Sequence, residues 1–182
     1  MKIALDVDDV LGAFYPTMCR TFNKPELLVN TWDGKGDCLW LAKKFPELYK
    51  DLGFWSTITV LSNPASITFD FDYYITSIPQ HLHDIRESWL LSHGFPKKPV
   101  ICTLYGDKVK TMQELGLNVL IDDKPETIKK VRKAGMTGIQ FVPPYMNNYS
   151  KSDPHTIKHL SEVNDILKKL KFKEEIKSLL KS

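Results

Sequence analysis

The sequence predicts an α/β protein built on a doubly wound parallel sheet. Short apolar runs, of the length of buried strands, occur along the chain in alternation with segments of helical spacing. This arrangement is typical of parallel sheets. Two of these runs, at residues 3–5 and 119–121, end abruptly in carboxylates. In open α/β sheets, ligands bind beyond the carboxyl ends of the strands. The acids therefore mark the edge of the sheet where a site is expected.

The order of the elements follows from apolar pattern and from the positions of glycine and proline. The expected strands lie at residues 3–5, 69–78, 99–104, 119–122 and 138–142. The expected helices lie at residues 13–22, 39–45, 81–93, 108–115 and 125–134. Pro46 is expected to stop the second helix, and Gly94 and Gly116 to end the third and fourth. Pro125 suits the first turn of the fifth helix, and Pro143 halts the last strand.

The composition is that of an ordinary folded protein. The 182 residues suffice for one domain with a modest insertion, and 42% of them are hydrophobic and 26% charged. The net charge is +3, and residues 151–182, with eight lysines and five acids, account for this excess. The whole-chain charge thus argues neither for nor against a nucleic-acid partner. An interrupted apolar stripe in 151–182 predicts a helical tail that packs on the core or on a second copy of the chain.

The cysteines and the hydropathy pattern predict a cytoplasmic protein. Cys19, Cys38 and Cys102 are too few and too scattered for a disulfide framework or a Cys-x-x-Cys metal site. No apolar stretch approaches the roughly 20 residues that a membrane span needs. We therefore expect no membrane partner and no secretory signal.

Two acidic pairs are the candidate metal ligands. Residues two apart on a strand point the same way, so Asp6 and Asp8 are expected to share one face at the end of the first strand. Asp122 and Asp123 follow the fourth strand in the same manner. The four acids can converge on one hard cation with oxygen ligands, and Mg²⁺ is the expected ion. Asp6 and Asp8 taken alone are equally typical of a strand that runs into a solvated acidic turn.

Two further strand ends supply groups that suit a phosphoryl ligand. The second strand ends in the hydroxyls of Thr76 and Ser77, and Lys108 follows the third strand after a glycine-containing turn. Lys110 is the competing lysine, because it too can reach the site from the first turn of the next helix. Acids, hydroxyls and a lysine, each placed just after a strand, are the groups needed to bind and transfer a phosphoryl group.

The order of these motifs resembles that of the haloacid dehalogenase-like (HAD) phosphohydrolase superfamily, and within it the 5'(3')-deoxyribonucleotidases. The matching segments are Asp6-Val7-Asp8-Asp9-Val10-Leu11, Thr76-Ser77, Asp107-Lys108 and Leu120-Ile121-Asp122-Asp123. The resemblance covers roughly residues 1 to 145. It departs where Asp9 replaces a glycine and where Gly106 stands at a position that tends to be arginine in those nucleotidases.

The resemblance implies a domain organisation. Residues 1–12 and 58–150 would form a Rossmann-like HAD core, residues 13–57 a small helical cap inserted after the first strand, and residues 151–182 a C-terminal helical tail. The insertion is rich in aromatic residues, most of which are expected to pack in a small core of their own. Phe14, Phe54 and Trp55 flank its entry and exit and are the ones expected to face a ligand, where flat rings would suit a nucleobase.

The resemblance also implies a role for each site residue. Asp6 would be the nucleophile that forms an aspartyl-phosphate, and Asp8 a general acid that later acts as general base. Mg²⁺ would be held by Asp6, the backbone carbonyl of Asp8, and the Asp122-Asp123 pair. The phosphoryl oxygens would be bound by the side chains of Thr76, Ser77 and Lys108.

The expected function is therefore that of a Mg²⁺-dependent phosphomonoesterase acting on (deoxy)nucleoside monophosphates. One alternative is a phosphatase that acts on the 3'-phosphate ends of nucleic acid, which the basic tail would contact, or on other small phosphometabolites. A further alternative is a non-catalytic phosphate-binding or receiver-like signalling domain. The expected partner is a small phosphomonoester, and the protein would be a monomer or a homodimer.

Overall fold

The computed structural model describes residues 1–24, 37–104, 106–146 and 152–180. Six parallel strands form one sheet in the order β3-β2-β1-β4-β5-β6. The strands are β1 (Ile3–Leu5), β2 (Tyr73–Thr76), β3 (Val100–Cys102), β4 (Val119–Asp122), β5 (Thr137–Phe141) and β6 (Thr156–Ile157). The predicted α/β class with a doubly wound parallel sheet is confirmed. Receiver domains have the order 2-1-3-4-5, so this sheet is not that of a receiver.

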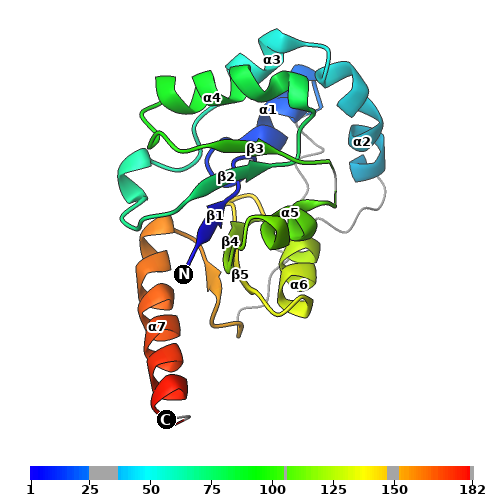
Figure 1. The fold of residues 1–182 in the computed structure, drawn as a ribbon. Coiled ribbons are helices and arrows are strands. Elements are labelled where there is room, and N and C mark those ends of the chain that lie inside the picture. The colour runs from blue at the N-terminus through cyan, green and yellow to red at the C-terminus, as the bar shows by residue number, and fades with distance from the viewer. Residues whose placement is uncertain (25–36, 105, 147–151, 181–182) are drawn as a thin grey trace.

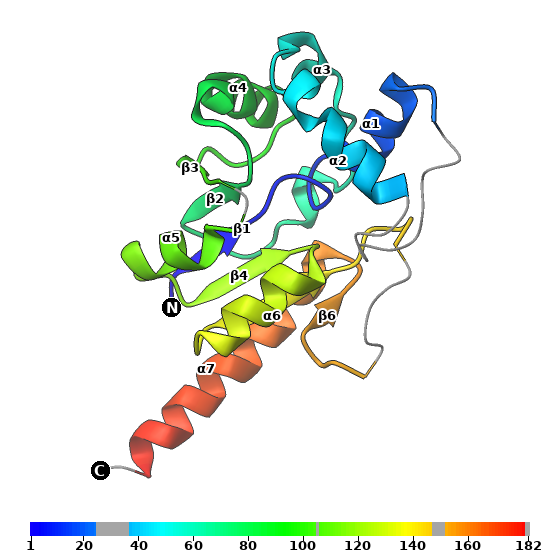
Figure 2. The same ribbon diagram turned by 90° about the vertical axis from the view of Figure 1, so that its right-hand side faces the viewer.

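Helices cover both faces of the sheet and form a group of their own beyond it. The α-helices are α1 (Phe14–Thr21), α2 (Asp37–Leu48), α3 (Leu52–Thr57), α4 (His83–Ser92), α5 (Lys108–Glu114), α6 (Pro125–Lys133) and α7 (Val163–Leu179). Short 3₁₀ turns lie at Pro64–Ser66, Gln80–Leu82 and Leu160–Glu162. Figures 1 and 2 show α1, α2 and α3 gathered at one end of the molecule, whereas α7 runs away from them toward the opposite end. No helix in the described part of the chain is long and apolar enough to span a bilayer.

The alternation of side chains along β1 divides the core between the two faces of the sheet. Ile3 and Leu5 belong to the larger apolar cluster, whereas Ala4 belongs to the smaller one on the other face, as a period of two requires. The smaller cluster is completed by side chains of α5 and α6, among them Met112 and Val131.

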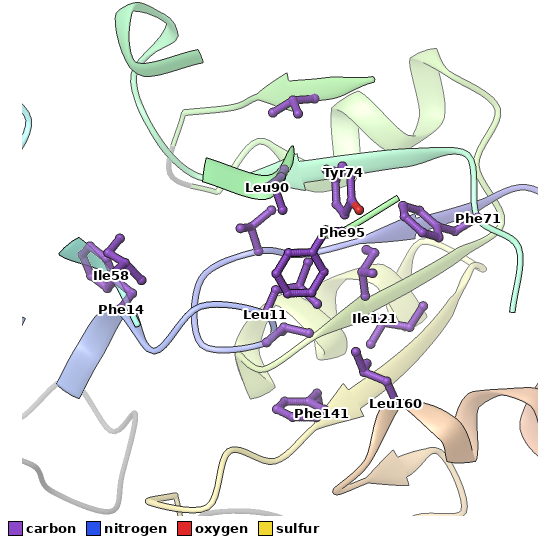
Figure 3. Packing of buried hydrophobic residues seen from close by; sticks show 14 of the residues in the cluster. Leu11, Phe14, Ile58, Phe71, Tyr74, Leu90, Phe95, Ile121, Phe141 and Leu160 are labelled. Carbon is purple, nitrogen blue, oxygen red and sulfur yellow. The ribbon is translucent and has the colours of Figure 1, made fainter. Parts of the chain in front are cut away.

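The larger cluster joins the sheet to α4 and to the C-terminal tail. Figure 3 shows part of it, with Tyr74, Ile121 and Phe141 from the strands beside Leu90 of α4 and Leu160 of the tail. In α7, Val163, Ile166 and Leu167 are also buried in this cluster, so the first half of the helix packs on the core. Farther along the same helix, Phe172 and Ile176 are exposed.

Three local expectations were wrong or incomplete, each for a physical reason. Helix α2 continues through Pro46, because the helix loses only one backbone hydrogen bond there and burial of Leu48 holds the next turn. The second strand was expected at residues 69–78 but spans only Tyr73–Thr76. Phe69 and Phe71 have the apolar pattern of a strand because their side chains are buried in the core, although they lie outside the sheet. Residues 151–182, expected as a helical tail, also supply the two-residue strand β6 at the edge of the sheet.

Candidate active site

The strand order brings the predicted site residues to one edge of the sheet. Strand β1 lies between β2 and β4, so the residues that follow these three strands are neighbours. The backbone N–H of Asp6 donates to the carbonyl of Ile121 at 2.9 Å, which continues the pairing of β1 with β4 past the end of β1. Backbone pairing between strands therefore fixes the positions of Asp6, Thr76 and Asp122.

Three buried carboxylates form the centre of the site. Asp6, Asp122 and Asp123 each offer an oxygen within 4.8 Å of the others. The Nζ atom of Lys108, at the start of α5, lies 2.6 Å from Asp6 Oδ2 and 2.7 Å from Asp122 Oδ2. Lys108 itself is 5% exposed, so the ammonium group is enclosed with the acids it bridges. Lys110 points elsewhere: its side chain is exposed and pairs with Glu114 at 3.8 Å.

Burial sets the protonation behaviour of this cluster. Burial raises the pKa of Asp6 well above 3.8, and although the charge of Lys108 opposes this, the charges of Asp122 and Asp8 add to it. Burial likewise raises the pKa of Asp123, with the charge of Asp122 adding to the effect. Burial alone would lower the pKa of Lys108, but the charges of Asp122 and Asp6 outweigh it and raise the pKa. The cluster is thus short of positive charge.

The carboxylate cluster fits a divalent cation. Three carboxylates and one ammonium leave an excess of two negative charges when all are ionised. The Oδ2 atom of Asp123 is buried and has no hydrogen-bond partner among the residues that the structure describes, which is costly for a carboxylate oxygen unless another group occupies that side. Oxygen donors of this kind suit Mg²⁺. Asp6, Asp122 and Asp123 are therefore the side chains that could hold the ion.

Asp8 lies outside this cluster and is held by two other side chains. The Thr76 hydroxyl donates to Asp8 Oδ2 at 3.0 Å, and Nη2 of Arg86 donates to Asp8 Oδ1 at 2.7 Å. The Asp8 side chain is 20% exposed, whereas that of Arg86 is 1% exposed. The structure thus separates two acids that are only two residues apart and gives them different surroundings. The predicted contact of Thr76 and the neighbouring Ser77 with a phosphoryl group stays a prediction.

Sequence reasoning missed Arg86, although a signal was present. Leu82, Arg86 and Trp89 follow one another at spacings of four and three, which places the arginine within the apolar stripe of its helix. Leu82 and Trp89 are both buried, as a residue between them on that stripe should be. A charged residue on the buried face of a helix predicts a specific partner, here Asp8.

Asp9 has the left-handed backbone conformation that usually favours glycine. Its φ is 57°, a conformation that aspartate tolerates better than most residues. Its buried carboxylate accepts hydrogen bonds from the backbone N–H of Tyr15, at 2.9 Å, and from the hydroxyl of Tyr145. Burial raises the pKa of Asp9 to about 7, while these two hydrogen bonds lower it. The residue therefore ties the turn after β1 to the start of α1 and to the segment after β5.

The three aromatic residues predicted to face a ligand are packed against each other. Phe14 stacks on Trp55 with ring centroids 5.6 Å apart, and Phe54 meets both rings edge-on. All three are buried. Their role in packing the insertion is observed, and contact with a base stays a prediction. Tyr49 is a further candidate: it is half-buried, and burial together with the nearby charge of Asp8 raises its pKa.

Among known proteins, the chain is similar to solved structures, and this similarity concerns the fold. No protein-family model matches the chain, and no curated protein matches it in sequence. The crystal structure of the L-2-haloacid dehalogenase PA0810 is similar with a TM-score of 0.59 and 13% identity, covering 91% of this chain and 97% of that one. A haloacid dehalogenase-like family hydrolase from Xanthomonas campestris is similar with a TM-score of 0.54 and 16% identity, covering 93% and 95%. The chain therefore has a haloacid dehalogenase-like fold.

Proposed function

We propose that this chain is a HAD superfamily enzyme, a Mg²⁺-dependent phosphomonoesterase that reacts through an aspartyl-phosphate on Asp6. The observation that carries the proposal is the separation of the two acids after β1. Asp6 lies in the buried cluster with Lys108, whereas Asp8 is held apart by Thr76 and Arg86. These different surroundings support Asp6 as the nucleophile and Asp8 as the proton donor and acceptor.

The metal would be held by the groups already in the cluster. Asp6, Asp122 and Asp123 would supply carboxylate oxygens, and the backbone carbonyl of Asp8 would be a further ligand. When bound, the ion would offset the repulsion between the Asp6 carboxylate and a phosphate dianion. The buried Oδ2 atom of Asp123, which has no partner in the described ranges, supports this assignment.

The reaction follows from the positions of the two acids. The Asp6 carboxylate attacks phosphorus, the bond to the ester oxygen breaks, and Asp8 protonates the departing alkoxide. The Asp8 carboxylate then takes a proton from a water molecule, which attacks phosphorus, frees Asp6 and releases inorganic phosphate. Lys108, with Thr76 and Ser77, would bind the phosphoryl oxygens as charge spreads over them.

The placement of Asp8 favours a phosphate ester over a haloacid as substrate. A halide ion leaves carbon without a proton, so a dehalogenation gains nothing from a general acid at this position. An alkoxide is a strong base and leaves far more readily when it is protonated as the bond breaks. Hydrogen bonds to both of its oxygens hold the Asp8 carboxyl group in one orientation, as a group that transfers protons requires.

The proposed substrate is a nucleoside monophosphate. The resemblance of the four motifs to the deoxyribonucleotidases supports this class, and so does the half-buried ring of Tyr49 near Asp8. A nucleic-acid 3'-phosphate gains less support, because α7 extends away from α1–α3 (Figures 1 and 2). The exposed residues Lys168, Lys169, Lys171 and Lys173 lie on this helix.

Phosphate release tests the proposal. Wild type is assayed with Mg²⁺ or EDTA on deoxy- and ribonucleoside monophosphates, a 3'-phosphorylated oligonucleotide and sugar phosphates, and halide release is followed from 2-chloropropionate. Asp6→Asn removes the nucleophile at constant size, and Asp70→Asn, at an exposed acid paired with Lys98, is the matched control. We expect metal-dependent release from nucleoside monophosphates that is lost only in Asp6→Asn. Halide release in place of phosphate release would refute the phosphatase assignment, and preference for the oligonucleotide would refute the substrate.

A further inference from the structure

We propose that Arg86 is a positioning residue that fixes the Asp8 carboxylate for proton transfer, and that Trp55 of the insertion helps to hold it in place. This inference rests on the proposed function, because it assigns Asp8 the role of general acid and base. It extends that function to a residue on α4 and to the contact between α4 and residues 13–57.

Two donors fix the Asp8 carboxylate at both of its oxygens. Arg86 Nη2 bonds Oδ1 at 2.7 Å, and the Thr76 hydroxyl bonds Oδ2 at 3.0 Å. With one donor on each oxygen, rotation of the carboxylate about its last bond would break at least one hydrogen bond. Catalytic groups need this kind of support, because a small error in their orientation lowers the rate of proton transfer.

The guanidinium group of Arg86 lies over two aromatic rings. Its central carbon lies 5.1 Å from the ring centroid of Trp55 and 5.8 Å from that of Trp89, within the range of cation–π attraction. Each indole is anchored by its own N–H, which donates at 2.8 Å to the carbonyl of Leu48 for Trp55 and of Ile58 for Trp89. A chain of fixed groups therefore runs from the insertion through Arg86 to Asp8.

The unused donors of Arg86 argue against a purely structural role. The residue is 1% exposed, yet its Nε and Nη1 atoms have no hydrogen-bond partner among the described residues. Burying a charged group with unsatisfied donors is costly, and an apolar side chain of similar length would pack the same space with less cost. Within the described part of the chain, the polar contact that compensates is the bond to Asp8. Arg86 is thus a buried cation with a high desolvation cost, and its described hydrogen-bond partner is Asp8, the proposed acid–base residue.

The role of Arg86 can be separated from general damage by changing the leaving group. The 4-nitrophenolate ion leaves without much help from an acid, whereas an alkoxide requires one. Loss of Asp8 orientation should therefore slow the phosphorylation step strongly for an alkyl phosphate and weakly for 4-nitrophenyl phosphate. A variant that merely disturbs the fold should slow both substrates alike.

The experiment measures single-turnover release of the leaving group by wild type, Arg86→Met, Arg86→Lys, Asp8→Asn and the double variant Asp8→Asn/Arg86→Met. General acid catalysis contributes about 10²- to 10⁴-fold. We therefore expect Arg86→Met to slow the alkyl phosphate by about 10²-fold and 4-nitrophenyl phosphate by less than about tenfold. Arg86→Lys, which keeps the charge, should restore part of the rate. In the Asp8→Asn background, Arg86→Met should have little further effect, since the group it positions is gone.

A second variant tests the same role of Arg86 if the first one is not folded. If Arg86→Met does not fold, as judged by circular dichroism, Trp55→Leu replaces it; it should show a smaller loss with the same dependence on leaving group. Equal losses on both substrates, or a full effect of Arg86→Met in the Asp8→Asn background, would overturn the inference. If wild type releases no phosphate from either ester, the proposed function has failed instead.

Discussion

Asp9 makes the stability of the protein depend on pH in a way that one substitution should remove. Its carboxyl group is buried at the turn after β1, and burial raises its pKa from 3.8 to about 7. The charge of Asp8 raises the pKa further, whereas hydrogen bonds from Tyr145 and Tyr15 lower it. Between pH 4 and 7 the folded protein therefore holds a proton that the unfolded chain has released.

The sign and size of the effect follow from this difference. The free energy of unfolding must fall as pH rises through this window, because the folded state has to give up a proton that it binds more tightly. Each unit of pKa difference corresponds to about 1.4 kcal/mol, so the gap between 3.8 and about 7 amounts to about 4 kcal/mol. The contribution is fully present below about pH 4 and is lost above about pH 7.

Asp9→Asn is the matched perturbation. Asparagine cannot ionise, keeps an oxygen that can accept from Tyr15 and Tyr145, and tolerates the left-handed conformation at φ 57°. Urea denaturation in EDTA, at pH values from 4.5 to 8, gives the free energy of unfolding of both proteins. The variant should become more stable relative to wild type as pH rises, by up to about 4 kcal/mol. Asp6 is present in both proteins, whereas the charge of Asp9 also raises the pKa of Asp123, so removing that charge adds to the difference in the same direction. Parallel pH profiles would refute the reasoning.

Three further predictions concern the site and the turn beside it. Lys108→Met should lower kcat/KM for a phosphate ester by about 10²- to 10³-fold, because a charge-stabilising donor is lost. Lys110→Met, at an exposed lysine, should have little effect. Equal losses in the two variants would contradict the assignment of Lys108 as the phosphate-binding lysine. Mg²⁺ at about 100 times its Kd should raise the free energy of unfolding by about 2.7 kcal/mol. Thermal denaturation should show most of this gain absent in Asp123→Asn, and an unchanged gain would place the ion elsewhere. Gly12→Ala should cost about 1–3 kcal/mol by urea denaturation, since its Cβ would lie 2.9 Å from the Ile58 side chain; no measurable change would mean that the turn can shift.

The parts of the fold that were predictable are those with a strong local signal. Strands β1 and β4 have the predicted bounds, because each is an apolar run bounded by charged or polar residues. Helix α6 was predicted to within a residue, since Pro125 and Gly135 frame it. Strand β6 was not predicted, because two residues carry too little pattern and their conformation depends on pairing with β5.

In the site, the sequence indicated the groups but not their partners. The side chains of Asp6, Asp8, Asp122, Asp123 and Lys108 were expected together because each follows a strand of one parallel sheet. The structure gathers all of them except Asp8, which is bound by Thr76 and Arg86 instead. The apolar stripe of its helix indicates that Arg86 is buried, but its bond to Asp8 joins distant parts of the chain, so no local pattern identifies the partner. The aromatic residues of the insertion carried an ambiguous signal, because flat rings suit a base and a packed core equally well.

The central place of β1 in the sheet also has a consequence for how the protein is made. The ribosome delivers β1 first, yet Ala4 pairs with Tyr73 on one side and Ile3 with Val119 on the other. Its second neighbour, β4, is therefore synthesised well after β1 and β2. Closing such a long loop is slow, and until β4 pairs with β1 the acidic turn is supported by the sheet on one side only. A nascent chain or fragment that stops before β4 should thus have no active site at all, and any activity should arise late and in one step.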